Sequence, residues 1–316
     1  MDEALTVINR GQLEAVRVED LRSEWLRWLG SRRSDLTVDA YRRAWDRFNE
    51  WLRDRGVAWS EVDPVMVGEW RNELKESYSA KTVNLQLTGI RSFYQFLIGS
   101  RGFNYPNPLR EVAGVRESRN HKRQEFTSEE VRAILDACDD SPLGIRDKAI
   151  LSLAVYTGLR EVEVVRANLE DLGTAGEFTI LKVWGKGRSE PDESVAIVGP
   201  NLEALRAWLR IRKGKGGPLF YSLSNQNRGD RLTTVAIRKM FARRCDEAGI
   251  VRQDRVKTFH SLRHTMITNA IRHGVDPSKV MLLSRHKSLD VMMGYYHEAN
   301  RFEDPPELYV NYDNGV

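Results

Sequence analysis

The stretch TGLREVE, residues 157–163, ends one helix at Gly158 and begins another at Arg160. The first turn of a helix has unpaired N–H groups and a partial positive charge, which favour an anion. The planar guanidinium of Arg160 can bind two phosphate oxygens at once, and Glu163 lies at i+3, close enough to orient it. Alternatively, this stretch is a C-cap glycine beside a surface Arg–Glu pair.

The residues on either side of this stretch predict a mostly helical unit with a small antiparallel sheet. Residues 144–157 form the helix before it, and β-prone residues 178–184 and 194–198 flank the turn GKGR at 185–188. Lys186 lies at the tip of that turn, where lysines are usually flexible and point outward. Helical patterns then follow at 202–211, 234–248, 260–272, 277–283 and 289–297.

The stretch HSLRH, residues 260–264, places His260 and Arg263 on one helical face with Leu262 turned inward. Imidazole titrates near neutrality and arginine keeps its proton, so the pair suits proton transfer beside a phosphate. The alternative is a His–Arg edge on a surface helix. His286 and Tyr295 are nine residues apart, so they converge only if His286 precedes the helix, with Ser288 as N-cap.

The N-terminal residues predict four helices: one with an apolar face at 21–29, one over 37–52 with Thr37 as N-cap, one after Asp63-Pro64, and one over 80–98. Residues 104–108 interrupt this pattern, and 116–123 are polar and basic, which indicates a linker. Thr127 and Glu130 form a capping-box pair that begins the next unit.

The composition excludes several classes of protein. With 316 residues, 41% of them hydrophobic, the chain is long enough for two packed cores. It has no apolar run long enough for a membrane helix, and its first 22 residues do not resemble a signal peptide. Its two cysteines, Cys138 and Cys245, give neither a disulfide framework nor a zinc site, so we expect a cytoplasmic protein.

The charge is uneven along the chain. Residues 1–115 hold 17 basic and 17 acidic side chains, residues 116–300 hold 31 basic and 24 acidic, and the last 16 residues are acidic. An excess of basic side chains favours binding of a polyanion such as nucleic acid. An ordinary soluble protein with solvated charges can have the same excess.

Together these motifs resemble the tyrosine recombinases, the phage-integrase and Xer family. The resemblance covers nearly the whole chain and rests on TGLR, GKG, HxLRH, His286 and a tyrosine nine residues later. It implies a mainly α (α+β) fold, with a four-helix SAM-like core-binding domain and a larger catalytic domain carrying the sheet. The implied divisions are residues 1–115 for the DNA-binding domain, 116–125 for the linker, 126–300 for the catalytic domain and 301–316 for a tail.

The resemblance also implies the chemistry. Tyr295 would attack a backbone phosphorus and leave a 3′-phosphotyrosine, without ATP, metal or other cofactor. Arg160 and Arg263 would neutralise the non-bridging oxygens. Lys186 would protonate the leaving 5′-oxygen, His260 would accept a proton or hydrogen bond from the tyrosine, and His286 would bind the scissile phosphate.

The chain departs from the family's usual pattern at several positions. Arg285 stands where the family usually has glycine, which we expect to add positive charge beside the phosphate. Glu161 replaces a commonly apolar residue, and the strand after Gly187 is acidic where relatives often carry Lys or Arg. Tyr296 adjoins Tyr295, so either could be the nucleophile, although the spacing from His286 favours Tyr295. His264 and His297 are interpreted as structural or supporting residues.

The expected partners are double-stranded DNA carrying a specific recombination site and three further copies of this chain, with no membrane. The candidates for DNA contact are Lys81, Asn84 and Arg91 on the fourth helix and Arg119, Lys122 and Arg123 in the linker. Alternatively, these residues lie on helix faces that only contact solvent. The tail, residues 301–316, is expected either to dock on a neighbouring protomer or to be a frayed terminus. Rival functions are a type IB topoisomerase, a catalytically inactive DNA-binding accessory protein and a metal-dependent nuclease.

Overall fold

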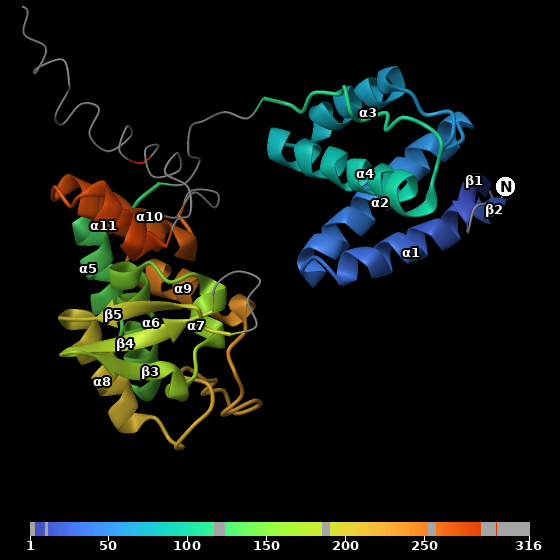
Figure 1. The fold of residues 1–316 in the computed structure, drawn as a ribbon. Helices are drawn as coiled ribbons and strands as arrows, with labels where there is room; N and C mark the ends of the chain where they lie inside the picture. Colours follow the sequence, from blue (N-terminus) through green and yellow to red (C-terminus); the bar gives the residue numbers. More distant parts are fainter. Residues whose placement is uncertain are drawn as a thin grey trace, which may run out of the picture. The chain divides into compact units, whose positions relative to one another are not determined.

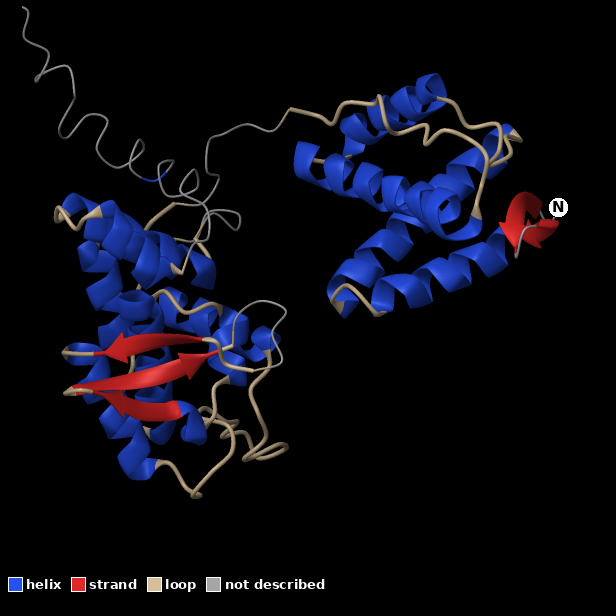
Figure 2. Ribbon diagram, viewed as in Figure 1, coloured by secondary structure: helices blue, strands red, loops and turns tan. Residues whose placement is uncertain are grey.

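The computed structural model describes residues 4–9, 12–116, 124–184, 190–251, 257–285 and 295. It divides into two compact units, Met1–Asn120 and His121–Val316, each of which is considered by itself. The fold is mainly helical with a small antiparallel sheet, as the sequence predicts, although the sheet has three strands where two were predicted (Figures 1 and 2).

The first unit contains four helices and an N-terminal hairpin. The helices are α1 (Val18–Gly30), α2 (Asp35–Arg55), α3 (Pro64–Ser77) and α4 (Ala80–Arg101). Side-chain caps begin two of them: Asp63 accepts a hydrogen bond from Met66 N at α3, and Ser79 accepts one from Thr82 N at α4. The hairpin, β1 (Ala4–Asn9) and β2 (Gln12–Arg17), was not predicted from the sequence.

The N-cap predicted at Thr37 is wrong. Helix α2 begins a turn earlier, with Ser34 as N-cap and the acidic residue Asp35 in the first turn, where it is stabilised by the helix dipole. Thr37 lies inside that turn, and its hydroxyl is 3.0 Å from the hydroxyl of Ser34.

Tryptophan and phenylalanine rings fill the core of the first unit. Trp45 and Trp59 stack at a centroid distance of 5.3 Å, and Phe93 meets both rings edge-on. Helices α2 and α4 approach closely at Gly89, where a Cβ would lie 2.8 Å from Cβ of Ala44. A glycine therefore allows the two longest helices of this unit to pack along each other.

The second unit places the sheet against a layer of helices (Figure 2). The sheet has the order β3-β4-β5, formed by Leu172–Ala175, Phe178–Val183 and Glu193–Ile197, with Leu181 opposite both Leu172 and Val195. The helices are α5 (Ser128–Asp136), α6 (Pro142–Thr157), α7 (Glu161–Arg166), α8 (Pro200–Ile211), α9 (Thr234–Glu247), α10 (Phe259–Arg272) and α11 (Pro277–Ser284), with a 3₁₀ turn at Leu169–Asp171. The predicted Thr127–Glu130 capping box is present at α5.

Helix α6 lies at the centre of this unit and contacts α5, α8, α10 and β5. Its residues Ala149, Ile150, Leu151, Leu153 and Ala154 are all fully buried. A helix that is apolar around its whole circumference is stable only when other elements pack against it on every side. This environment fixes the end of α6, and with it Gly158 and Arg160.

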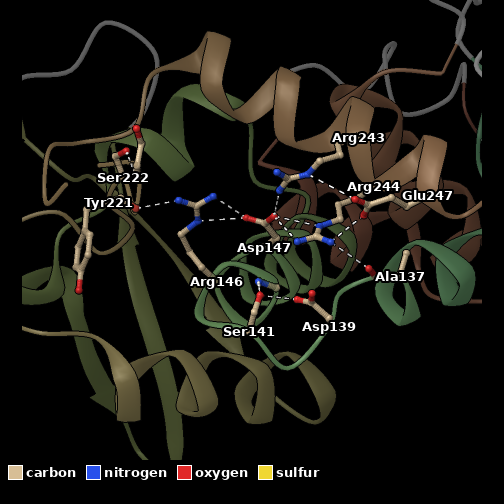
Figure 3. A network of polar contacts seen from close by, with 12 residues as sticks. Ala137, Asp139, Ser141, Arg146, Asp147, Tyr221, Ser222, Arg243, Arg244 and Glu247 are labelled. Carbon is tan, nitrogen blue, oxygen red and sulfur yellow. Dashed lines mark hydrogen bonds and ion pairs between the residues drawn. The ribbon is translucent and has the colours of Figure 1, made fainter. Parts of the chain in front are cut away.

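A buried carboxylate joins α6 to its neighbours (Figure 3). Asp147 is fully buried, and its two oxygens pair with Arg146 at 2.7 Å, Arg243 at 2.7 Å and Arg244 at 2.9 Å. Arg244 also donates to the carbonyl of Ala137, just beyond α5. Loss of any of these partners would leave a buried charge uncompensated, which costs free energy of folding. The ion pairs of Asp147 therefore fix the relative position of α5, α6 and α9.

Candidate active site

Arg263 lies at the centre of the candidate site, on the second turn of α10. Its residue surface is 1% exposed, Nη1 donates to the carbonyl of Gly158 at 2.8 Å, and Nη2 donates to the carbonyl of Ser284. The alternative of a surface His–Arg edge is therefore wrong for Arg263. Burial, together with the charges of Arg160 and Arg285, lowers the pKa of its guanidinium to about 10, so Arg263 stays charged at neutral pH.

Gly158 makes room for this arginine. It ends α6 in the left-handed conformation, with φ of 63°, and a Cβ there would lie 2.3 Å from Cε of Met266. The same Cβ would lie 3.4 Å from Cγ of Arg263. Only glycine fits both the backbone angle and the close approach of α10.

Arg160 occupies the N-cap position of α7, and its side chain is 32% exposed. Its Nη1 lies 2.6 Å from Oε1 of Glu163, and its backbone N–H donates to Oε2 of the same carboxylate at 2.8 Å. The predicted pairing of Arg160 with Glu163 is confirmed. The alternative of a surface pair is wrong, because the side chain of Glu163 is only 2% exposed.

Arg285 differs from its expected role. It ends α11 with φ of 55°, a conformation that costs a residue with a Cβ about 1–2 kcal/mol. Its side chain is 4% exposed, with Nη2 2.7 Å from Oε2 of Glu163 and Nε 3.2 Å from Oε2 of Glu193. The expectation of added positive charge beside the phosphate is therefore corrected: two carboxylates balance this guanidinium.

The other acidic departures also have partners. Glu193, the first residue of β5, is the second counterion of Arg285. Glu161 pairs with Arg238 of α9 at 2.7 Å. These contacts explain why carboxylates are tolerated at positions where the family commonly has apolar or basic residues.

Tyr295 is 5% exposed and packs against Met266, Ile267, Ile271 and Val280 from α10 and α11. Its hydroxyl lies 3.4 Å from Nε2 of His264, and the two rings are 5.1 Å apart between centroids. The structure therefore brings Tyr295 to α10, beside His264, the residue that follows Arg263.

His264 lies closer to the candidate site than its sequence position predicts. His260 is partly exposed and its ring is 5.6 Å from that of His264, one helical turn away. His264 lies beside the tyrosine hydroxyl. The i, i+4 spacing of the two histidines was the available signal, because both belong to the same face of α10.

Three candidates for DNA contact lie on α4. Lys81 is exposed at the start of the helix. The amide of Asn84 donates to the carbonyl of Val115 at 2.9 Å and accepts from its N–H at 2.8 Å. Arg91 donates to the carbonyls of Leu109 and Val112. Asn84 and Arg91 therefore attach the segment after α4 to this helix, a structural role that the sequence analysis did not predict.

Several predicted site residues lie outside the described residues. These are Lys186, His286, Arg119, Lys122 and Arg123, together with Ser288, Tyr296, His297 and the tail 301–316.

The part of the chain that the structure describes contains no cluster of three side chains suited to bind a metal. Both cysteines are buried thiols, and burial raises the pKa of the Cys138 thiol to about 11. Within the same described part, every helix falls short of the length and apolar character needed to cross a membrane.

The site thus gathers fixed guanidinium groups, imidazoles and a phenol at the junction of α6, α7, α10 and α11. Charged donors that are held in place can stabilise an anion that gains charge during a reaction. Such a group of fixed cations, imidazoles and a phenol is suited to a reaction at a phosphodiester, where negative charge develops on the phosphate oxygens.

Comparisons with known proteins identify the family. Residues 124–301 match the phage integrase family, and residues 23–100 match the N-terminal SAM-like domain of phage integrases. The chain belongs to the phage integrase family and is a tyrosine-type site-specific recombinase.

Relatives and solved structures agree with this assignment. Tyrosine recombinase XerC of Vibrio vulnificus is 28% identical over 260 residues, which cover 81% of this chain and 79% of XerC. Tyrosine recombinase XerD of Pseudomonas aeruginosa is 29% identical over 284 residues, 88% of this chain and 92% of XerD.

Two solved structures share the fold. The XerH recombinase in a post-cleavage complex with difH has a TM-score of 0.72 at 19% identity, covering 93% of this chain and 89% of XerH. A lambda integrase tetramer on a Holliday junction has a TM-score of 0.71 at 17% identity, covering 92% and 80% of the two chains.

Proposed function

We propose that this recombinase cuts and rejoins DNA at a specific site through a 3′-phosphotyrosine on Tyr295. The observation that carries the proposal is the buried Tyr295 hydroxyl, 3.4 Å from Nε2 of His264 on α10, the helix that also carries the buried guanidinium of Arg263. A charged guanidinium that cannot move away pays no reorganisation cost when negative charge develops on a phosphate.

In the proposed reaction the Tyr295 oxygen forms a bond to phosphorus, and the bond from phosphorus to the 5′-oxygen breaks. The phenol proton passes to a histidine, and the leaving 5′-oxygen receives a proton from Lys186. His264 lies close enough to the hydroxyl to share the acceptor role proposed for His260. Because the phosphotyrosine keeps the ester bond energy, the second step reverses the first without ATP.

The remaining residues act on the phosphate. Arg160 and Arg263 bind its non-bridging oxygens, and His286 donates a hydrogen bond to it. Two guanidinium groups supply the electrostatic stabilisation that other nucleases obtain from metal ions, so we expect cleavage to need no metal.

The proposed partner is double-stranded DNA, bound by four copies of this chain on two paired sites. The lambda integrase tetramer on a Holliday junction supports this assembly by analogy of fold. Lys81, Arg119, Lys122 and Arg123 are proposed to contact phosphates; these contacts would make binding sensitive to salt and would carry little sequence information.

The tail, residues 301–316, is proposed to dock on a neighbouring protomer. A cavity of about 640 Å³ between α5, α6 and α10 offers an acceptor, lined by apolar residues such as Val131, Val155 and Leu283 and by basic residues such as Arg132 and Arg272. The tail contains both apolar residues, such as Phe302 and Leu308, and acidic ones, such as Glu303 and Asp304, so both kinds of lining have complementary side chains.

The proposed function is tested with DNA selected by this protein from a random duplex pool. A duplex of the selected sequence, nicked near its centre, is incubated with the protein and EDTA and run on a denaturing gel. We expect a covalent protein–DNA band that is absent in Tyr295→Phe and retained in Tyr296→Phe.

Each other outcome has a distinct meaning. A band lost in Tyr296→Phe but kept in Tyr295→Phe would move the nucleophile by one residue. Binding without any band would favour an inactive accessory protein, and cleavage only with added metal would favour a nuclease. Relaxation of supercoiled plasmids without sequence preference would favour a type IB topoisomerase.

A further inference from the structure

Arg285 is held in a conformation that its backbone does not favour. Among the described residues, it is the one non-glycine residue with a positive φ, at 55°. A Cβ makes the left-handed region unfavourable, so contacts of the side chain must hold it there.

Those contacts join three elements. The Arg285 guanidinium pairs with Glu163 of α7 at 2.7 Å and with Glu193 of β5 at 3.2 Å. It also donates to the carbonyl of Thr157, the last residue of α6, at 3.3 Å. The end of α11 is thereby fixed to α6, α7 and the strand that follows the predicted Lys186 turn.

Glu163 divides its two oxygens between two arginines. Oε1 pairs with Nη1 of Arg160 at 2.6 Å, and Oε2 pairs with Nη2 of Arg285 at 2.7 Å. Since Oε2 also accepts from the Arg160 N–H, the carboxylate is fixed from both ends. Its orientation determines where the Arg160 side chain is held.

The charges of this group balance. Arg160 and Arg285 carry two positive charges, and Glu163 and Glu193 carry two negative charges, with the first carboxylate 2% exposed. Without Arg285, Glu163 would lose one of its two guanidinium partners and Glu193 would lose its counterion.

We propose that Arg285 is a positioning residue for strand cleavage: paired with Glu193, it fixes Glu163 and thereby holds Arg160 toward the scissile phosphate. This inference rests on the proposed function, since it assigns Arg160 to the phosphate. It gives the unusual Arg285 and the acidic residue in β5 a shared role.

The test measures covalent adduct formation in a single turnover on the selected nicked duplex, at saturating protein. Arg285→Gly removes the guanidinium and suits the left-handed backbone, so the fold should persist, as thermal unfolding would verify. We expect the adduct rate to fall about tenfold while DNA affinity changes less than about twofold. Arg285→Lys, which keeps the charge, should recover part of the rate.

The route through Glu163 is tested by a double-mutant cycle. In Glu163→Gln protein, which already lacks the carboxylate, Arg285→Gly should cause little further loss. Arg43→Ala serves as the control, because it removes an exposed α2 arginine that pairs with Asp39 and should leave the adduct rate unchanged.

Two results would overturn the inference: an unchanged rate in Arg285→Gly, or an equal loss in the wild-type and Glu163→Gln backgrounds. A wild-type protein that binds its DNA but forms no adduct would instead contradict the proposed function, and would remove the basis of the inference with it.

Discussion

Two arginines of the site differ in how the protein surrounds them. Arg263 is 1% exposed and donates to the carbonyls of Gly158 and Ser284. Arg160 is one third exposed, and its main partner, Glu163, keeps Arg285 as a second ion pair. We therefore expect Arg263 to contribute to folding as well as to the proposed chemistry, and Arg160 to contribute mainly to the proposed chemistry.

Substitution by alanine should separate these contributions. Arg263→Ala leaves two buried carbonyls without their donor, and each unsatisfied buried group costs about 1–3 kcal/mol. We expect a clearly lower free energy of unfolding and loss of the covalent adduct. Arg160→Ala should also lose the adduct with a smaller loss of stability, which chemical denaturation would measure. Equal destabilisation by the two variants would contradict this distinction.

Sequence spacing could predict contacts within one helix but not those between distant segments. The i, i+3 spacing of Arg160 and Glu163 predicts their pairing, and the structure confirms it. Arg285 meets Glu163 and Glu193 only because α7, β5 and α11 converge in the fold. A local sequence pattern cannot predict which distant elements converge. The sequence therefore indicated that Arg285 adds a positive charge, whereas in the structure this charge is paired with two carboxylates.

At the scale of elements, the junction between α6 and α10 depends on Gly158. The chain turns there with φ of 63°, and α10 comes so close that Met266 occupies the space of a Cβ. Gly176, between β3 and β4, has a similar φ of 59° but no atom within 4 Å of the position of a Cβ. The two glycines thus differ in packing and share the same backbone requirement.

Their alanine variants form a matched pair. Gly176→Ala should cost about 1–2 kcal/mol for the left-handed backbone and should leave cleavage unchanged. Gly158→Ala should cost more, because Met266 and Arg263 must also shift, and it should lower the adduct rate. Thermal unfolding and the single-turnover assay measure both effects. Equal destabilisation by the two variants would show that the close approach of α10 to Gly158 contributes nothing to the free energy of unfolding.

The elements that the sequence predicted have strong periodicity or clear end signals. The four N-terminal helices, the Thr127–Glu130 capping box and the long strands of the sheet are of this kind. Strand β3 was missed because its four residues, with Gly173 among them, acquire their conformation by pairing with β4. The start of α2 was misplaced because both Ser34 and Thr37 are suitable N-caps, and only the structure distinguishes them.

At the scale of the whole molecule, assembly is proposed to depend on the tail. A chain ending at residue 300 should still bind a single DNA site but should lose complexes that contain two sites. Native gels and analytical ultracentrifugation with the selected duplex distinguish these species. Two-site complexes of unchanged stability would contradict docking of the tail on a neighbouring protomer.

The separate cores of the two units have an optical consequence. Six of the eight tryptophans, at positions 25, 28, 45, 51, 59 and 70, belong to the first unit, and the stacked pair Trp45–Trp59 lies among them. Intrinsic fluorescence and near-ultraviolet circular dichroism will therefore report mainly on the first unit. An unfolding curve recorded by tryptophan emission alone would overlook much of what happens around Tyr295.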